Sequence, residues 1–174
     1  QARSPDGREQ RVVCAPKHYL NYDLEGRKDS WQSDWGPSRN DFDAVVLKQE
    51  QVEYYLPQFH RMMTVGQPGG VMCSTNRVNG VDSCMNDVYL NGFLRGKFNF
   101  SGFVVTDGNS CGNTNCRATV KLLKNATAAA EWTEEGHELA AELCVEGGTD
   151  IELGSTLNGY TTGAVENGAS AGVG

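Results

Sequence analysis

Four short apolar runs punctuate the sequence, at 11–15, 70–73, 102–105 and 148–153. The first three are continuous rather than alternating, which is typical of strands that are covered on both faces in a parallel sheet. The fourth mixes apolar with polar positions, so its strand pattern is weaker. The sequence therefore predicts four strands in this order.

Segments with helical periodicity lie between and after these runs, at 42–63, 87–98 and 127–145. Within the first, Pro57 is expected to start a new turn, because proline fits the first turn of a helix but lacks the N–H that a helix interior needs. In the third, an apolar stripe opposes a glutamate-rich face, with Thr127 as N-cap and Gly147-Gly148 as the end. A last helical segment, weakly patterned, is 160–166.

Strands that alternate with helices indicate right-handed βαβ units. Such units build either a doubly wound sheet or a (β/α)8 barrel. No glycine fingerprint for dinucleotide binding follows the first strand, so nothing specific supports a dinucleotide-binding doubly wound sheet. Four units are about half of a barrel, which takes about 250 residues. The predicted fold is therefore α/β, the second half of a (β/α)8 TIM-type barrel. Residues 1–174 are expected to be a fragment of a longer protein, with the remaining barrel mainly upstream.

The composition is that of an acidic globular protein: 39% of its 174 residues are hydrophobic and 21% are charged. The formal charge of −7 argues against a nucleic acid or an anionic membrane as partner, because both require clustered lysine and arginine. No apolar run approaches the roughly 20 residues of a membrane span. Two glycosylation sequons, at Asn99 and Asn125, together with the cysteines, favour a secreted or secretory-pathway protein.

The six cysteines suggest two disulfides, since two pairs each close a short loop. The candidate pairs are Cys73 with Cys84 and Cys111 with Cys116. The remaining two, Cys14 and Cys144, fall on a predicted strand and a predicted helix, where buried free thiols are expected. Connectivity depends on the separation and direction of the side chains, which sequence does not give.

Polar residues follow each predicted strand, and the C-terminal ends of barrel strands form the mouth where barrel enzymes keep their active sites. These residues are Lys17-His18, Ser74-Thr75-Asn76, Asp107 and Gly154-Ser155. A lysine, a histidine, an amide and a carboxylate at one mouth can hold a polyhydroxylated ligand. Each sugar hydroxyl both donates and accepts, and a charged partner strengthens the hydrogen bond.

Asp107 is the strongest candidate for catalysis, because it directly follows the predicted strand residues Phe103-Val104-Val105-Thr106. A carboxylate there could attack an anomeric carbon and hold a covalent glycosyl intermediate, with a second carboxylate about 5–5.5 Å away as general acid and base. That partner is not assigned within the chain. Spacing alone favours a different role, in which Asp107 caps the segment that follows.

Metal chemistry is not indicated, since no cysteine or histidine spacing matches a zinc site. His60 falls in a helical segment and His137 lies beside the glutamate-rich face, so both are expected to be structural or solvated. No cofactor is predicted.

Five strings follow one another along the chain: KHY at 17–19, EYYLPQF at 53–59, VMCSTNRVNG at 71–80, LRG at 94–96 with FSGFVVTD at 100–107, and GTDIELGS at 148–155. In this order they resemble motifs of glycoside hydrolase family 3, and the resemblance spans about 12–168. The spacer 21–40 and the Gly-Ser end of the last string are similar to the β-xylosidase branch. An unrelated (β/α) enzyme is a further hypothesis, which the five ordered strings disfavour.

The resemblance implies a retaining, exo-acting β-glycosidase of β-xylosidase or β-glucosidase type, which hydrolyses terminal sugars of oligosaccharides or glycosides. It places Asp107 at the nucleophile position and Lys17 and His18 on sugar hydroxyls. It also implies that the acid/base residue and a C-terminal domain belong to the remainder of the polypeptide.

Two departures fall on the implied substrate-binding positions. Thr75 stands where the family has a tyrosine that hydrogen-bonds the nucleophile, and Gly108 stands where it has tryptophan or cysteine. Both changes suit an alternative function, a catalytically impaired relative that acts as an extracellular carbohydrate-binding or structural protein, because a fold does not establish an activity.

Overall fold

The structure is a computed structural model that describes residues 6, 12–26, 38–124, 133–157 and 159. The strands are β1 (Asp43–Ala44), β2 (Gly70–Cys73), β3 (Arg77–Val78), β4 (Val81–Asp82) and β5 (Phe103–Thr106). The α-helices are α1 (Lys48–Glu50), α2 (Leu56–Arg61), α3 (Thr114–Lys124) and α5 (Glu134–Gly147). Helical segments of other types are η2 (Gln51–Tyr55), η3 (Met62–Gly66), η4 (Ser83–Met85), η5 (Val88–Lys97) and η6 (Ser110–Gly112).

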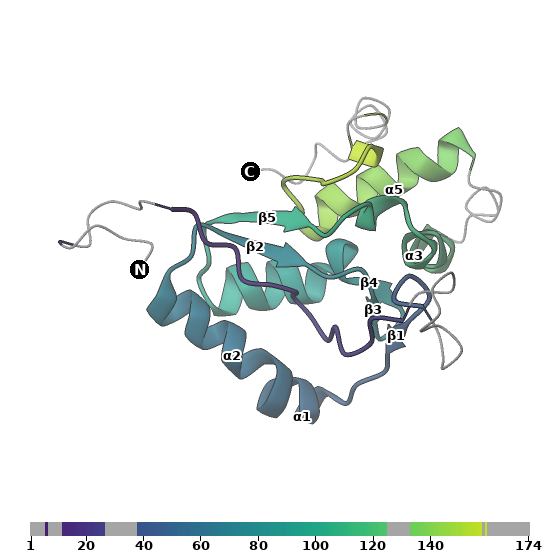
Figure 1. Cartoon of the computed structure of the whole chain (residues 1–174). Coiled ribbons are helices and arrows are strands. Elements are labelled where there is room, and N and C mark those ends of the chain that lie inside the picture. Colours follow the sequence, from purple (N-terminus) through teal and green to yellow (C-terminus); the bar gives the residue numbers. More distant parts are fainter. Residues whose placement is uncertain (1–5, 7–11, 27–37, 125–132, 158, 160–174) are drawn as a thin grey trace.

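β2 and β5 form the centre of a parallel arrangement (Figure 1). The segment 14–19 lies parallel along β2, where Tyr19 bridges Cys73. The segment around Ile151 lies parallel along β5, where it bridges Val105. The spatial order of the four segments therefore follows their order in the chain, which confirms the predicted α/β class with consecutive parallel strands.

The first strand lies later in the chain than the predicted 11–15. Its pairing with β2 begins at Cys14, whose carbonyl accepts from the Gly70 N–H, and continues through the Pro16 carbonyl. Pro16 has no N–H to donate, so the ladder stays incomplete up to Tyr19. Val12 and Val13 precede the paired part and are 64% and 55% exposed, not buried as the apolar run suggested.

One continuous helix runs from Lys48 to Gly66 through α1, η2, α2 and η3 (Figure 1). The prediction of a helix from residue 42 was wrong at its start, because 43–44 forms β1 and pairs with β3. Pro57 lies in the first turn of α2, just after the π-helical turn η2, as expected of a proline that starts a new turn. Leu56, Phe59 and Met63 are buried in the core.

The later helices depart from the prediction at their ends. η5 covers most of the predicted 87–98 and buries Leu90 and Leu94. α5 begins after Thr133, whose hydroxyl accepts from the Gly136 N–H. It ends at Gly147, and the capping residue Gly148 has a φ of 105°, which suits glycine. The predicted N-cap Thr127 and the predicted helix 160–166 lie outside the described residues.

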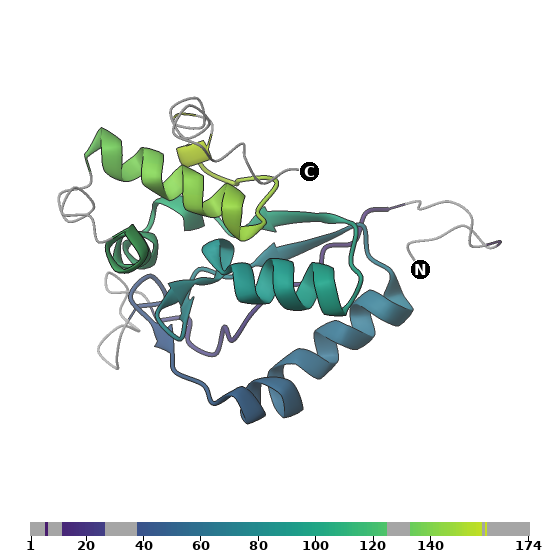
Figure 2. The ribbon, with the colours of Figure 1, turned by 180° about the vertical axis from the view of Figure 1, so that it is seen from behind.

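Figures 1 and 2 show the α1–α2 helix and α5 on opposite sides of the β2–β5 pair. The helices each contribute apolar residues to one core around these strands. Its fully buried members include Val71, Val104, Leu90, Leu94, Val120 and Ala140. No helix among the described residues combines the length and the apolar character that crossing a membrane demands.

Two disulfides are present. Cys73 bonds to Cys84, as their spacing suggested, whereas Cys111 bonds to Cys144 and not to Cys116. The pairing of Cys111 with Cys116 was wrong because α5 packs against η6 and brings the Cα atoms of Cys111 and Cys144 to 6.4 Å. Cys144 is therefore buried but not free.

The two free thiols are Cys116, which is buried, and Cys14. The Cys116 Sγ donates to the Cys111 carbonyl over 2.9 Å. Cys14 is exposed, contrary to the expectation of a buried thiol, because it lies where the first strand only begins to pair with β2.

Arg95 and Asp150, which lie in two of the five strings described above, connect the last strand to β5. The Arg95 Nη2 lies 2.6 Å from the Asp150 Oδ2, and the same oxygen accepts from the Val104 N–H. Arg95 also donates to the Gly102 and Gly148 carbonyls. These residues therefore fix the strand that precedes Asp107.

Candidate active site

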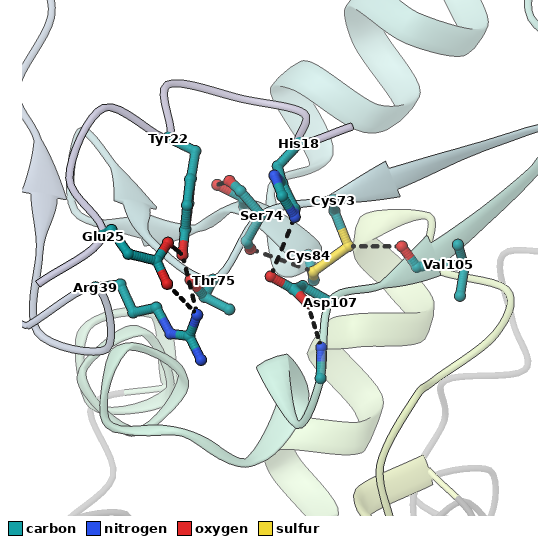
Figure 3. Close-up of polar contacts among 12 residues, drawn as sticks. His18, Tyr22, Glu25, Arg39, Cys73, Ser74, Thr75, Cys84, Val105 and Asp107 are labelled. Atoms are coloured by element: carbon teal, nitrogen blue, oxygen red, sulfur yellow. Dashed lines mark hydrogen bonds and ion pairs between the residues drawn. A yellow bond between two sulfur atoms is a disulfide. The ribbon is translucent and has the colours of Figure 1, made fainter. Parts of the chain in front are cut away.

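Asp107 and His18 meet at the C-terminal ends of neighbouring strands (Figure 3). Asp107 directly follows β5, and its N–H donates to the Cys73 carbonyl at the end of β2. His18 directly precedes the Tyr19 bridge to Cys73. The parallel register thus brings the His18 Nε2 to 3.4 Å from the Asp107 Oδ2.

The Asp107 carboxylate is held from two sides. Its Oδ1 accepts the Gly108 N–H over 2.7 Å, and its Oδ2 faces His18. The side chains of His18 and Asp107 keep 20% and 24% of their exposure, so solvent or a ligand reaches both. This geometry leaves a fixed, accessible carboxylate at the strand end.

Burial lowers the pKa of His18 below its ordinary value, and the Lys17 charge acts in the same direction. The Asp107 carboxylate opposes this shift by raising the pKa, but it is the smaller influence. His18 is therefore neutral at neutral pH, when one ring nitrogen donates and the other accepts. A neutral imidazole suits a contact with a sugar hydroxyl.

Lys17 lies beside His18 but does not reach the carboxylate. It is exposed and, with His18, Tyr22 and Tyr55, lines a cleft of about 340 Å³ against the helix that contains η2 and α2. Within the described part of the chain, Lys17 makes no ion pair with Asp107. The peptide bonds that follow Lys17 and Tyr19 are cis.

Sequence reasoning missed a polar cluster beside this pair, which we name the Tyr22 cluster: Tyr22, Glu25, Arg39 and Thr75 (Figure 3). The Tyr22 hydroxyl donates to one Glu25 oxygen over 2.6 Å, and the Arg39 Nη1 lies 2.7 Å from the other. The Tyr22 ring packs on the His18 ring with centroids 4.8 Å apart. The cluster therefore adjoins the His18–Asp107 pair.

The predicted substrate-binding positions Thr75 and Gly108 differ in their surroundings. Thr75 is 2% exposed, and its carbonyl accepts from the Asn115 side chain over 2.7 Å. Gly108 faces open space, since an added Cβ would meet no atom within 4 Å. The missing side chain at Gly108 thus leaves room next to the carboxylate.

Two of the four other strand-end residues, Ser74 and Asn76, serve the structure around the site. The Ser74 hydroxyl and the Asn76 amide both donate to the Leu20 carbonyl, which holds the turn after His18. Gly154 and Ser155 are exposed, and among the described residues neither makes a polar contact with Asp107.

The other two histidines lie outside this group. The exposed His60 ring packs on Phe98, with ring centroids 5.0 Å apart. Burial lowers the pKa of His137, which lies in α5.

Comparison with known proteins gives independent evidence on the family of this chain. No model of a known protein family matches the chain. A β-xylosidase/α-L-arabinofuranosidase of Medicago sativa subsp. varia is 34% identical over 168 residues, which cover 97% of this chain and 19% of that protein. A probable exo-1,4-β-xylosidase of Aspergillus fumigatus is 35% identical over 158 residues, 86% of this chain and 17% of that protein.

Among solved structures, a family 3 exo-β-xylosidase in complex with a xylobiose aziridine activity-based probe matches 92% of this chain with a TM-score of 0.71 and 30% identity. This chain covers 18% of that one. The chain belongs to glycoside hydrolase family 3. A family 3 β-glucosidase of Bifidobacterium adolescentis, at 21% identity and a TM-score of 0.63, shares the fold.

The relatives that are named β-xylosidases place this family 3 chain near the xylosidase branch. The chain spans about a fifth of the length of the curated relatives it matches, since it covers 19% of the Medicago protein.

Proposed function

We propose that the chain is part of a longer family 3 enzyme, a retaining, exo-acting β-glycosidase of β-xylosidase type with Asp107 as nucleophile. The observation that carries this proposal is the geometry of Asp107, whose Oδ1 accepts from the Gly108 N–H while its Oδ2 lies 3.4 Å from the His18 Nε2. A nucleophilic carboxylate must be fixed in direction and accessible. The two contacts fix it, and 24% of the Asp107 side chain stays exposed.

In the proposed reaction, one carboxylate oxygen of Asp107 attacks the anomeric carbon of the terminal sugar. The bond between that carbon and the glycosidic oxygen breaks, and a general acid protonates the leaving oxygen. The conjugate base of that acid then takes a proton from water, which attacks the glycosyl ester; the sugar is released, and the Asp107 carboxylate and the general acid are both restored. His18, as a neutral imidazole, and Lys17, from the adjoining cleft, would bind hydroxyls of that sugar.

The general acid is proposed to come from the remainder of the polypeptide. Glu25 is the carboxylate of the Tyr22 cluster, but its pKa lies below the ordinary value, chiefly because the Tyr22 hydroxyl donates to it. A general acid needs the opposite shift. Glu25 is therefore ionised and paired with Arg39, which does not suit proton donation.

The two disulfides support a secreted protein, because such bonds persist in oxidising compartments. Asn99 is exposed and begins a sequon, which supports N-glycosylation there. The second sequon asparagine, Asn125, lies outside the described residues.

The short Thr75 and the open space at Gly108 keep a second candidate function in view, a relative that binds saccharides without hydrolysing them. Hydrolysis of aryl β-xyloside, aryl β-glucoside and aryl α-arabinofuranoside by the full polypeptide separates the two. The enzyme hypothesis predicts turnover by the wild type and its loss in Asp107→Asn, with the circular dichroism spectrum and Tm retained. Binding of xylose without turnover of any of the three would instead support the binding protein.

A further inference from the structure

A cleft of about 580 Å³ lies at the end of the β2–β5 pair from which both strand arrows start in Figure 1, opposite Asp107. Its residues come from the end of η3 and from the two loops that directly precede the strands, 67–69 before β2 and 98–102 before β5. Both walls therefore belong to this chain. One of the lining residues is Asn99, the asparagine of the first sequon.

The end of η5 explains an asparagine at position 99 but not the hydroxyl that completes the sequon. Asn99 follows Phe98, the C-cap residue, and has a φ of 54°, a left-handed conformation that asparagine adopts more readily than most residues. The Phe100 N–H donates to the Leu94 carbonyl, which fixes the backbone beyond it. Helix termination does not require Ser101, which is exposed and makes no polar contact with the described residues.

The Asn99 side chain is available for modification. It is exposed, and its amide has no hydrogen-bond partner in the part of the chain that the structure describes. Because the helix end fixes its backbone, a sugar on the Asn99 Nδ2 would start from a rigid point in the wall of the cleft. Such a sugar loses little further freedom when it packs against the cleft, which favours the packed state.

The lining of the cleft suits a neutral sugar. None of the described residues that line it is charged. The Phe98 ring is held edge-on by His60 and Phe93 and stays half-buried, so it offers apolar surface to the C–H face of a pyranose. On the η3 side, the exposed Thr64 hydroxyl donates to the His60 carbonyl, and its oxygen can still accept from a sugar hydroxyl.

We propose that Asn99 carries an N-linked glycan whose first sugar packs in this cleft, against Phe98 and Thr64. In the transfer, the Asn99 Nδ2 gives up one proton and bonds to the anomeric carbon of a lipid-linked oligosaccharide. The bond from that carbon to the lipid pyrophosphate breaks, and the lipid pyrophosphate is the leaving group. The inference rests on the secretory pathway proposed above, where Asn-x-Ser acceptors are used, and not on glycosidase activity.

The test compares two changes at one exposed residue of the full polypeptide, secreted from a yeast that N-glycosylates its proteins. Ser101→Ala removes the acceptor hydroxyl, whereas the matched control Ser101→Thr keeps it. Glycopeptide mass spectrometry measures the occupancy of Asn99. Hydrogen exchange, read by mass spectrometry, measures the protection of the amides at 64–67 on the η3 side of the cleft.

The wild type and Ser101→Thr are expected to carry a glycan on Asn99 and to show equal exchange at 64–67. Ser101→Ala should lack the glycan and exchange these amides roughly 2- to 10-fold faster, as expected when one weak contact is lost. Trimming the wild type with an endoglycosidase that leaves a single N-acetylglucosamine should keep the slow exchange, because the first sugar makes the contact. Turnover of aryl β-xyloside should be the same in all forms, since the cleft lies at the end of the strands opposite Asp107.

Either of two results overturns the proposal. A bare Asn99 in the secreted wild type would show that the site is not used, whatever the state of Asn125. Equal exchange at 64–67 in Ser101→Ala and the glycosylated wild type would show that the sugar extends into solvent. Failure of the proposed function looks different, because the wild type would then turn over no aryl β-xyloside while the glycan and the exchange difference remained.

Discussion

Asp82 is a fully buried carboxyl group, and Asp82→Asn tests how its surroundings set the pH dependence of stability. The Asp82 Oδ1 accepts the Cys84 N–H over 2.9 Å, while the Oδ2 is buried with no partner among the described residues. Burial raises the pKa of Asp82 well above 3.8, and the Cys84 hydrogen bond and the Arg77 charge oppose this only in part. Asp82 is therefore protonated in the folded protein at mildly acidic pH.

The direction of the pH dependence follows from the protonation of Asp82 in the folded and the unfolded protein. Below pH 3.8, the unperturbed value, the folded and unfolded proteins both carry the proton. As the pH rises, the unfolded carboxyl ionises while the folded one stays neutral, so stability is lost until the pH passes the raised pKa. One proton difference corresponds to about 1.4 kcal/mol of unfolding free energy per pH unit in that window.

Asp82→Asn removes the titrating group, and its amide oxygen can still accept the Cys84 N–H. We expect the unfolding free energy of the variant, from urea titrations at pH 4 to 6, to fall less steeply with pH than that of the wild type, by up to about 1.4 kcal/mol per unit. Asp87→Asn, at an exposed carboxylate, is the control and should keep the wild-type slope. Equal slopes for the wild type and Asp82→Asn would refute the reasoning.

Two further predictions concern packing and cross-links. Gly108→Ala should change the unfolding free energy by less than about 0.5 kcal/mol, because its Cβ meets nothing within 4 Å. Gly147→Ala should lower the unfolding free energy by about 1–3 kcal/mol, because its Cβ would lie 2.6 Å from the Met85 backbone, and equal urea midpoints of the two variants would contradict this. Replacing Cys73 and Cys84 together by alanine should lower the unfolding free energy by about 3 kcal/mol, measured in urea, because the disulfide closes a loop across 11 residues. An unchanged midpoint would show that this cross-link is not a source of stability.

β2 and β5 were predictable because they are short, continuous apolar runs whose residues are buried in the structure, as Val71 and Val104 are. The run 11–15 was less informative, since Val12 and Val13 are exposed. The place of Asp107 at the end of β5 followed from the same pattern. α3 was missed because its buried face carries Asn115, Cys116 and Thr119 in addition to Val120, so no apolar stripe marks it. Polar side chains that hydrogen-bond in the interior hide a helix from hydrophobic periodicity.

The Tyr22 cluster could not be derived from the pattern of the chain. Glu25 and Arg39 are 14 residues apart in a stretch with no apolar period, and only the fold brings the Arg39 guanidinium to Glu25 and the Tyr22 ring onto His18. The Cys111–Cys144 disulfide escaped for the same reason, since its cysteines are 33 residues apart and meet through the packing of α5 on η6. Sequence spacing informs about neighbours in the chain, whereas these contacts are tertiary.

Covalent trapping tests the nucleophile most directly. The full polypeptide is incubated with a 2-deoxy-2-fluoro-β-xyloside that carries an activated leaving group, and the inactivated protein is digested and analysed by mass spectrometry. The proposed mechanism predicts one added fluoroxylosyl group, on the peptide that contains Asp107, and no addition in Asp107→Asn. A label on another carboxylate, or turnover of aryl β-xyloside by Asp107→Asn at the wild-type rate, would contradict it.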